Sequence, residues 1–195
     1  MRLILASSSA RRQELLRSAG FDFDVRPSGV EEARLPDENP ESYVRRTARD
    51  KALAVATSAL SVPDALVLAA DTEVVVSGEI LGKPRDGEDA ARMLRLLSGR
   101  THRVITGVCL ARPLGSIEAL EHETTRVTFR KLDDREIRHY IRSGEPFDKA
   151  GAYAVQGLAS RFVTRIEGSY SNVVGLPISL VYSLLKPFLP LPIFD

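Results

Sequence analysis

The amino-acid sequence predicts an α/β protein, because short apolar runs typical of strands alternate along the chain with amphipathic segments typical of helices. Its 195 residues suffice for one domain, or for one domain with two lobes, that buries a large core. Hydrophobic residues make up 44% of the chain and charged residues 27%, as in an ordinary globular protein. We therefore expect a single domain over residues 1–195.

The charge balance and the cysteine and histidine content exclude several classes of function. Lysine and arginine number 27 and aspartate and glutamate 26, which argues against a nucleic-acid-binding surface. One cysteine, Cys109, excludes a disulfide framework within the chain. The histidines are isolated from one another, so no zinc-type spacing occurs. We expect no nucleic-acid partner and no structural zinc.

Nothing in the sequence indicates a membrane or export signal. No apolar segment approaches the roughly 20 residues that a membrane-spanning helix needs. The apolar stretch at the N-terminus gives way to serines after a few residues and is too short for a signal peptide. We therefore expect a cytoplasmic protein with no membrane partner.

The stretch from Leu66 to Pro84 contains the most informative acid. Leu66–Ala69 is typical of a buried strand, Val74–Val76 is a second apolar run, and a hairpin turn follows it. Asp71 lies between the two runs and must lose water on folding, which is unfavourable unless the carboxylate finds a partner. A divalent cation with a phosphate substrate would supply that partner. The alternative is a carboxylate that caps a strand end or forms a salt bridge there.

The N-terminal segment has the pattern of an anion-binding turn. A strand predicted over Arg2–Ala6 leads through Ser7–Ser9, the last serine being a plausible N-cap, into a helix over Ala10–Ala19. Arg11 and Arg12 fall in the first turn of that helix, where the helix dipole disfavours cations. Backbone amides, hydroxyls and guanidiniums together would bind a phosphate well. The alternative is that both arginines are solvated or pair with nearby acids.

A second helix is predicted to begin at Asn39–Pro40, with asparagine as N-cap and proline in the first turn. Its apolar stripe contains Val44 and Val55, and Lys51 points along the centre of that stripe. A lysine there must either extend out to solvent or meet an anion. The acids Glu31 and Glu32 precede this helix in a loop, and they would matter if the loop folded over Asp71.

The remaining elements follow from periodicity and capping signals. Further strands are predicted over Phe21–Val25, His102–Ala111, Arg126–Arg130 and Phe162–Ile166, and further helices over Gly87–Leu97, after the capping box of Asp133 and Glu136, and up to Leu185. The glycine-rich segment Glu145–Gly157 would let a ligand approach the backbone, and Gln156 in it could read a base edge. The proline-rich tail over residues 186–195 is expected to be irregular.

Long motifs identify a family. LASSSARRQELL, AADTEVVVSGEILGKP, SGRTHRVITGV and EPFDKAGAYAVQG…IEGSYSNVVGLP match the Maf family in order and spacing, so the chain resembles that family over nearly its whole length. The resemblance implies an enzyme that splits a nucleoside triphosphate into the monophosphate and pyrophosphate with Mg²⁺ or Mn²⁺. It also implies a mixed, elongated, twisted sheet flanked by helices, similar to the inosine triphosphate pyrophosphatases, with two lobes around a central cleft, and commonly a homodimer.

Two branches of the family differ at positions that this sequence contains. Arg11, Thr72 and Gln156 match the branch acting on dTTP and UTP, whereas the branch acting on 7-methyl-GTP carries tryptophan, glutamine and glutamate there. The resemblance therefore implies a pyrimidine nucleoside triphosphate as substrate, including modified pyrimidine nucleotides, and a role in removing non-standard nucleotides. Ala154 stands where the family usually has glycine.

The resemblance also implies a role for each motif residue. Asp71 would be the general base and, with Glu32 and a further candidate Glu31, would hold the cation. Groups implied to neutralise the triphosphate are Lys51, Lys83, Arg12 and the turn residues Ser7 and Ser9. Arg11, Thr72 and Gln156 would recognise the pyrimidine. The alternative is a nucleotide-binding regulator of cell division and septum formation whose hydrolysis is incidental.

Overall fold

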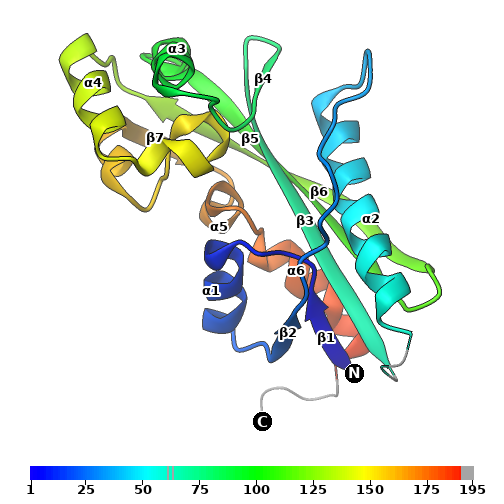
Figure 1. The fold of residues 1–195 in the computed structure, drawn as a ribbon. Helices are drawn as coiled ribbons and strands as arrows, with labels where there is room; N and C mark the ends of the chain where they lie inside the picture. The colour runs from blue at the N-terminus through cyan, green and yellow to red at the C-terminus, as the bar shows by residue number, and fades with distance from the viewer. Residues whose placement is uncertain (61, 63, 190–195) are drawn as a thin grey trace. The chain divides into compact units, whose positions relative to one another are not determined.

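A computed structural model of the chain describes residues 1–60, 62 and 64–189 (Figure 1). These residues form two compact units. The first comprises Met1–Asp71, Thr106–Glu123 and the described residues from Gly175 onward, and the second comprises Thr72–Ile105 and Thr124–Val174. Two units agree with the expected two lobes, while a cleft between lobes stays a prediction.

The strands form one mixed sheet, as expected. Their bounds are β1 (Arg2–Leu5), β2 (Phe23–Val25), β3 (Ala65–Val76), β4 (Glu79–Leu81), β5 (Thr101–Ala111), β6 (Ile117–Phe129) and β7 (Val163–Glu167). The order is β2-β1-β3-β5-β6-β7, with β4 pairing β3. Strand β1 runs parallel to β2 and β3, whereas β4 is antiparallel to β3 and β7 to β6. Strands β3, β5 and β6 each contribute residues to both units.

Helices flank the strands, and three of them begin at N-cap residues that the sequence predicted. Their bounds are α1 (Ala10–Ser18), α2 (Pro40–Ser58), α3 (Gly87–Leu97), α4 (Asp134–Arg142), α5 (Tyr170–Val174) and α6 (Ile178–Leu185), with 3₁₀ turns η1 (Glu145–Asp148), η2 (Ala150–Ala152), η3 (Leu158–Phe162) and η4 (Lys186–Phe188). The side chains of Ser9, Asn39 and Asp133 accept hydrogen bonds from the first turns of α1, α2 and α4. The N-caps predicted at these residues are therefore confirmed.

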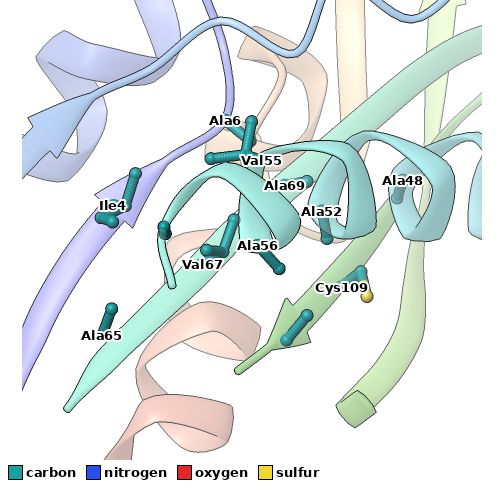
Figure 2. Packing of buried hydrophobic residues seen from close by; sticks show 12 residues of the cluster. Ile4, Ala6, Ala48, Ala52, Val55, Ala56, Ala65, Val67, Ala69 and Cys109 are labelled. Atoms are coloured by element: carbon teal, nitrogen blue, oxygen red, sulfur yellow. The ribbon is translucent and has the colours of Figure 1, made fainter. Parts of the chain in front are cut away.

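In the first unit, helices cover both faces of the strands. Figure 2 shows Ala52, Val55 and Ala56 of α2 packed on Ile4 and Val67 of the strands. The opposite face is covered by α1 and α6, whose buried leucine and valine side chains pack on the alternate strand residues. Because successive side chains of a strand point to opposite faces, the odd-numbered residues of β3 from 65 to 69 face α2. Residue 71 continues that row.

Helix α2 lies unusually close to β5 at Gly107. A Cβ atom at Gly107 would overlap the carbonyl of Val44 and lie 2.8 Å from the backbone nitrogen of Arg45. The backbone of α2 therefore rests directly on the sheet at this point, and only glycine leaves room for it. This contact sets the distance between α2 and the strands that face it.

In the second unit, aromatic rings form a buried cluster around His102. The His102 ring makes edge contacts with the rings of Phe129 and Tyr153, and its Nε2 atom lies 2.8 Å from the Tyr153 hydroxyl oxygen. His102 is 2% exposed, and this burial lowers its pKa from 6.5 to about 4. The imidazole is therefore neutral in the folded protein at neutral pH.

Two strands are longer than the sequence predicted. The strand expected over Leu66–Ala69 runs on to Val76, so Asp71 lies inside β3 and not at a strand end. The strand expected over Arg126–Arg130 begins at Ile117 in the structure. The first part of β6 carries mainly polar, partly exposed side chains, so it lacks the apolar alternation on which the prediction depended.

Two connections also differ from expectation. Residues 170–174 form α5, a helix that was not predicted, and residues 145–162 contain three 3₁₀ turns. The tail, expected to be irregular, begins with the 3₁₀ turn Lys186–Phe188, and the rest of that prediction, over residues 190–195, lies outside the described residues. Single-turn elements of this kind are stabilised by tertiary contacts, which periodicity does not reveal.

Replacing Gly107 by alanine is expected to lower the free energy of unfolding by about 3 kcal/mol, the upper end of the usual range for overpacking, because the new methyl group meets backbone and not a flexible side chain. Urea denaturation followed by circular dichroism measures this. Gly87→Ala is the matched control, since its Cβ would meet only Ile141 at 3.5 Å. Equal stability of the two variants would contradict the close contact.

The protein is expected to lose stability as the pH falls below 6.5. His102 binds a proton in the unfolded chain at higher pH than in the folded one, so its contribution is complete above pH 6.5 and is lost down to about pH 4. His102→Gln should reduce the loss of unfolding free energy between pH 8 and pH 5 by about 2 kcal/mol. Urea titrations at both pH values measure it, with the exposed His139→Gln as control. An identical pH dependence in both variants would refute the assignment.

Candidate active site

A lysine between two carboxylates forms the centre of the site in the first unit. The Nζ atom of Lys51 lies 2.8 Å from Oδ1 of Asp71 and 2.6 Å from Oε1 of Glu32. Lys51 and Asp71 are 6% and 3% exposed, whereas the Glu32 side chain is 39% exposed. Lys51 was expected either to extend out to solvent or to meet an anion. The structure shows the second: its ammonium group is buried and pairs with two carboxylates.

The fold explains why these groups meet. Asp71 follows Ala69 on the α2-facing row of β3, and Lys51 lies on the strand-facing stripe of α2. Each charge removes part of the desolvation penalty of the other, and taking one partner away from such a buried pair typically destabilises a protein by about 3–5 kcal/mol. The second oxygen of Asp71, Oδ2, is buried and has no hydrogen-bond partner among the described residues. That oxygen could bind a cation or take a proton.

The loop that carries Glu32 is held by two side chains of α2. The guanidinium of Arg46 donates to both carboxylate oxygens of Glu38, at 2.7 and 2.8 Å, and to the carbonyl of Ala33 at 2.8 Å. The hydroxyl of Tyr43 donates to the backbone carbonyl of Glu32 at 3.3 Å. Hydrogen bonding to Arg46 lowers the pKa of the Glu38 carboxyl, so the pair is charged at neutral pH.

Sequence reasoning missed both Arg46 and Glu38. A usable signal existed, because Arg46 lies on the same helix as Lys51 and Glu38 lies directly before the N-cap of that helix. Arg46 and Glu38 pair with each other across the loop, however, and an arginine on a helix is usually a solvated side chain. Only the folded path of the loop shows that these residues place Glu32.

The serine turn lies beside the strand that carries Asp71. Arg12 donates through Nη1 to the carbonyl of Ala70 at 2.7 Å and to Oγ of Ser7 at 3.4 Å, and through Nε to the carbonyl of Gly175 at 2.8 Å. These carbonyls offset the unfavourable position of a cation at a helix N-terminus. Arg12 therefore fixes the turn to the residue that precedes Asp71, and its expected contact with phosphate stays a prediction.

The predicted residues fall into two groups. Those in the first unit are Ser7, Ser9, Arg11, Arg12, Glu31, Glu32, Lys51 and Asp71; those in the second are Thr72, Lys83 and Gln156. The structure brings together the lysine–carboxylate cluster and, through Arg12, the serine turn. Their convergence with the second group on one ligand stays a prediction.

The residues in the second unit lie on connected segments. Lys83 and Gln156 are both exposed, and Thr72 is half-buried on β3 directly after Asp71. The backbone N–H of Gly151 donates to the carbonyl of Gly82 at 3.0 Å, so the turn that precedes Gln156 contacts the residue next to Lys83. A Cβ at Gly151 would lie 2.9 Å from the Val74 side chain, which shows how tightly this turn packs.

The donor chemistry limits what the site can hold. Among the described residues, no three histidine, cysteine or acidic side chains are grouped as a preformed metal site. Within residues 1–60, 62 and 64–189, no helix has the length and apolar composition needed to cross a membrane. An α/β fold with a carboxylate–lysine–carboxylate cluster beside a helix N-terminus defines a protein that can bind an anionic ligand together with a cation.

Comparisons with known proteins show the family. Residues 2–188 match the model of the family described as Maf-like protein, and the chain belongs to that family. It is 54% identical to the dTTP/UTP pyrophosphatase of Koribacter versatilis (strain Ellin345) over 186 residues, which is 95% of this chain and 94% of the relative. It is 52% identical over 187 residues to the dTTP/UTP pyrophosphatase of Anaeromyxobacter dehalogenans (strain 2CP-C), with 95% and 93% covered.

A solved structure supports the fold. The chain superimposes on the Ham1 protein of Staphylococcus aureus with a TM-score of 0.50, 13% identity, and coverage of 97% of this chain and 100% of that one. At this identity the likeness concerns the fold alone. Together with the observed sheet, it confirms the expected mixed α/β architecture.

Breaking the Arg46–Glu38 pair is expected to release the loop that carries Glu32. Glu38→Gln removes a charged acceptor whose hydrogen bonds are worth about 1.5–3 kcal/mol, so amide hydrogen exchange over residues 32–38 should rise about tenfold or more. Hydrogen exchange with mass spectrometry measures it. Asp24→Asn, which breaks only the exposed pair with Arg2, is the control. The same exchange in both variants would show that the pair does not hold the loop.

Proposed function

We propose that this protein is a nucleoside triphosphate pyrophosphatase that hydrolyses dTTP and UTP to the monophosphate and pyrophosphate. Modified pyrimidine nucleotides, whose removal would keep them out of nucleic acids, belong to the same proposed substrate class. Membership of the Maf family and more than 50% identity to relatives named dTTP/UTP pyrophosphatase support the substrates. The observation that carries the chemistry is the buried Asp71, with one oxygen on Lys51 and the other buried without a partner among the described residues.

Asp71 has the environment of a general base. The ammonium group of Lys51 donates to Oδ1 at 2.8 Å and fixes the orientation of the carboxylate. Oδ2 would take the proton of a water molecule as that water's oxygen bonds to the α-phosphorus. The bond from the α-phosphorus to the bridging oxygen then breaks, and pyrophosphate leaves with the electron pair.

Positive groups would neutralise the phosphates. The amides and hydroxyls of Ser7 and Ser9 stand at the start of α1, where the helix dipole favours an anion. Lys83 and Arg12 would add charge at the leaving group, and Lys51 would add charge near the attacked phosphorus. Arg11, Thr72 and Gln156 would recognise the pyrimidine, as the family resemblance implies.

The site fits a magnesium or manganese ion. Mg²⁺ is usually held by one or two carboxylates together with substrate phosphates and water, and Asp71 and Glu32 supply this donor set. The carboxylate of Asp71 would hold the ion from the buried side, and Glu32, with Glu31 as a further candidate, would hold it from the open side. When bound, the ion would supply charge neutralisation at the phosphate oxygens. A homodimer and a cytoplasmic location complete the proposal, the first from the family resemblance and the second from the sequence.

Asp71→Asn is expected to lower kcat for dTTP about 100-fold or more, because an amide cannot accept the proton of the attacking water. The fold should survive, since Lys51 keeps the carboxylate of Glu32 at 2.6 Å. Pyrophosphate release with Mg²⁺ measures turnover on dTTP, UTP, CTP, GTP and 7-methyl-GTP, and circular dichroism checks the fold. The exposed Asp24→Asn is the control.

Near-normal turnover by a folded Asp71→Asn protein would remove Asp71 from the mechanism. Release of pyrophosphate by the wild-type protein from 7-methyl-GTP but not from dTTP or UTP would overturn the substrate assignment. Binding of dTTP without any release would instead favour the nucleotide-binding regulator.

A further inference from the structure

We infer that Glu145 and Tyr140 are positioning residues that hold the turn around Gln156 and thereby set its selectivity for the pyrimidine. This inference rests on the proposed function, in which Gln156 contacts the base. Gln156 itself is exposed on the connection between η2 and η3. An exposed side chain on a connection can select a base only if its backbone is fixed.

Tyr140 holds the chain on one side of Gln156. It lies on α4 with 0% exposure, and its hydroxyl donates to Oε1 of Glu145 at 2.8 Å. The same hydroxyl oxygen accepts the backbone N–H of Ala154 at 3.2 Å. Burial, with the hydrogen bond to Glu145 as a second cause, raises the pKa of Tyr140, so the phenol keeps the proton that it donates.

Glu145 holds the chain on the other side. Its Oε2 accepts the backbone N–H of Leu158 at 2.9 Å, and its Oε1 accepts that of Ala159 at 3.4 Å. These are the first residues of η3, which has no cap from its own neighbouring side chains. A carboxylate 13 positions earlier in the sequence therefore caps this turn.

Tyr140 and Glu145 together form a clamp around the turn that contains Gln156. The backbone N–H of Gly157 donates to the carbonyl of Ala154 at 3.1 Å, which closes a turn with Gln156 inside it. Tyr140 binds the N–H at the start of this turn, and Glu145 binds the N–H that follows its end. The hydrogen bonds of the two side chains thus converge on the backbone at both ends of the turn.

Gly157 supports the same conclusion on steric grounds. A Cβ at this position would lie 2.5 Å from both Cδ and Oε1 of Glu145. The φ of Gly157 is −101°, so no left-handed conformation demands glycine here. The carboxylate of Glu145 requires the space, and the glycine provides it.

The test is nucleotide selectivity in steady-state pyrophosphate release. Glu145→Gln turns an acceptor oxygen into an N–H donor that faces another N–H, and it should lower the ratio of kcat/KM for dTTP to that for CTP about tenfold. The effect should fall on KM for dTTP, with kcat changed less than about twofold. Tyr140→Phe removes the hydroxyl that binds Glu145 and Ala154, and Gly157→Ala places a methyl group against the Glu145 carboxylate. Both should lower the same ratio.

A matched control separates positioning from general destabilisation. Glu136→Gln is the same chemical change on the same helix as Tyr140, where Glu136 pairs with Arg130 and completes the capping box. It should lower the melting temperature without changing selectivity. In a Gln156→Ala background, Glu145→Gln should cause no further loss of selectivity, because Glu145 acts through Gln156.

The outcomes distinguish this inference from the function on which it rests. Wild-type protein that releases no pyrophosphate from dTTP or UTP overturns the proposed function. Unchanged selectivity of Glu145→Gln, or full additivity with Gln156→Ala, overturns the inference while the function stands. Amide hydrogen exchange over residues 154–159 should rise in Glu145→Gln, and unchanged exchange would overturn the inference whatever the activity.

Discussion

The ion pair between Lys51 and Asp71 is the interaction on which the candidate active site depends. Both groups are almost fully buried, in a layer where β3 otherwise presents Ala65, Val67 and Ala69 to α2. A buried ion pair rarely stabilises a protein more than apolar residues of the same volume would. Its presence here therefore indicates chemistry, not stability. With Glu32 the cluster has two negative charges and one positive charge, an excess that attracts a cation.

The small residues around this pair allow α2 to approach the sheet closely. The face of α2 toward the strands carries Ala48, Ala52 and Ala56, and Gly107 of β5 lets the helix backbone rest on the sheet. Larger side chains would move α2 away from β3, and the lysine would no longer reach the carboxylate at hydrogen-bond distance. The alanine-rich packing and the site geometry thus have one cause, the short separation between α2 and the sheet.

The sequence predicted those features of the structure that depend on residues close to one another along the chain. Ser9, Asn39 and Asp133 cap helices because a few adjacent residues decide it, and the need of Asp71 for a partner follows from its apolar flanks. That this partner is Lys51, 20 positions away, required the folded chain. Glu145 escaped prediction for the same reason, because its acceptors are matched to backbone amides whose positions only the tertiary structure defines.

In each unit, an exposed segment that carries a predicted site residue is fixed by side chains that are themselves largely buried. Arg46 and Glu38 fix the loop of Glu32, and the Glu38 side chain is only 9% exposed where that of Glu32 is 39% exposed. In the second unit the fully buried Tyr140 binds the backbone at the start of the turn that contains the exposed Gln156. Loops lack the packing that orders a helix or strand, and charge-assisted hydrogen bonds to their backbone supply that order. The residues expected to meet a ligand remain open to it, because others, inside the protein, determine their position.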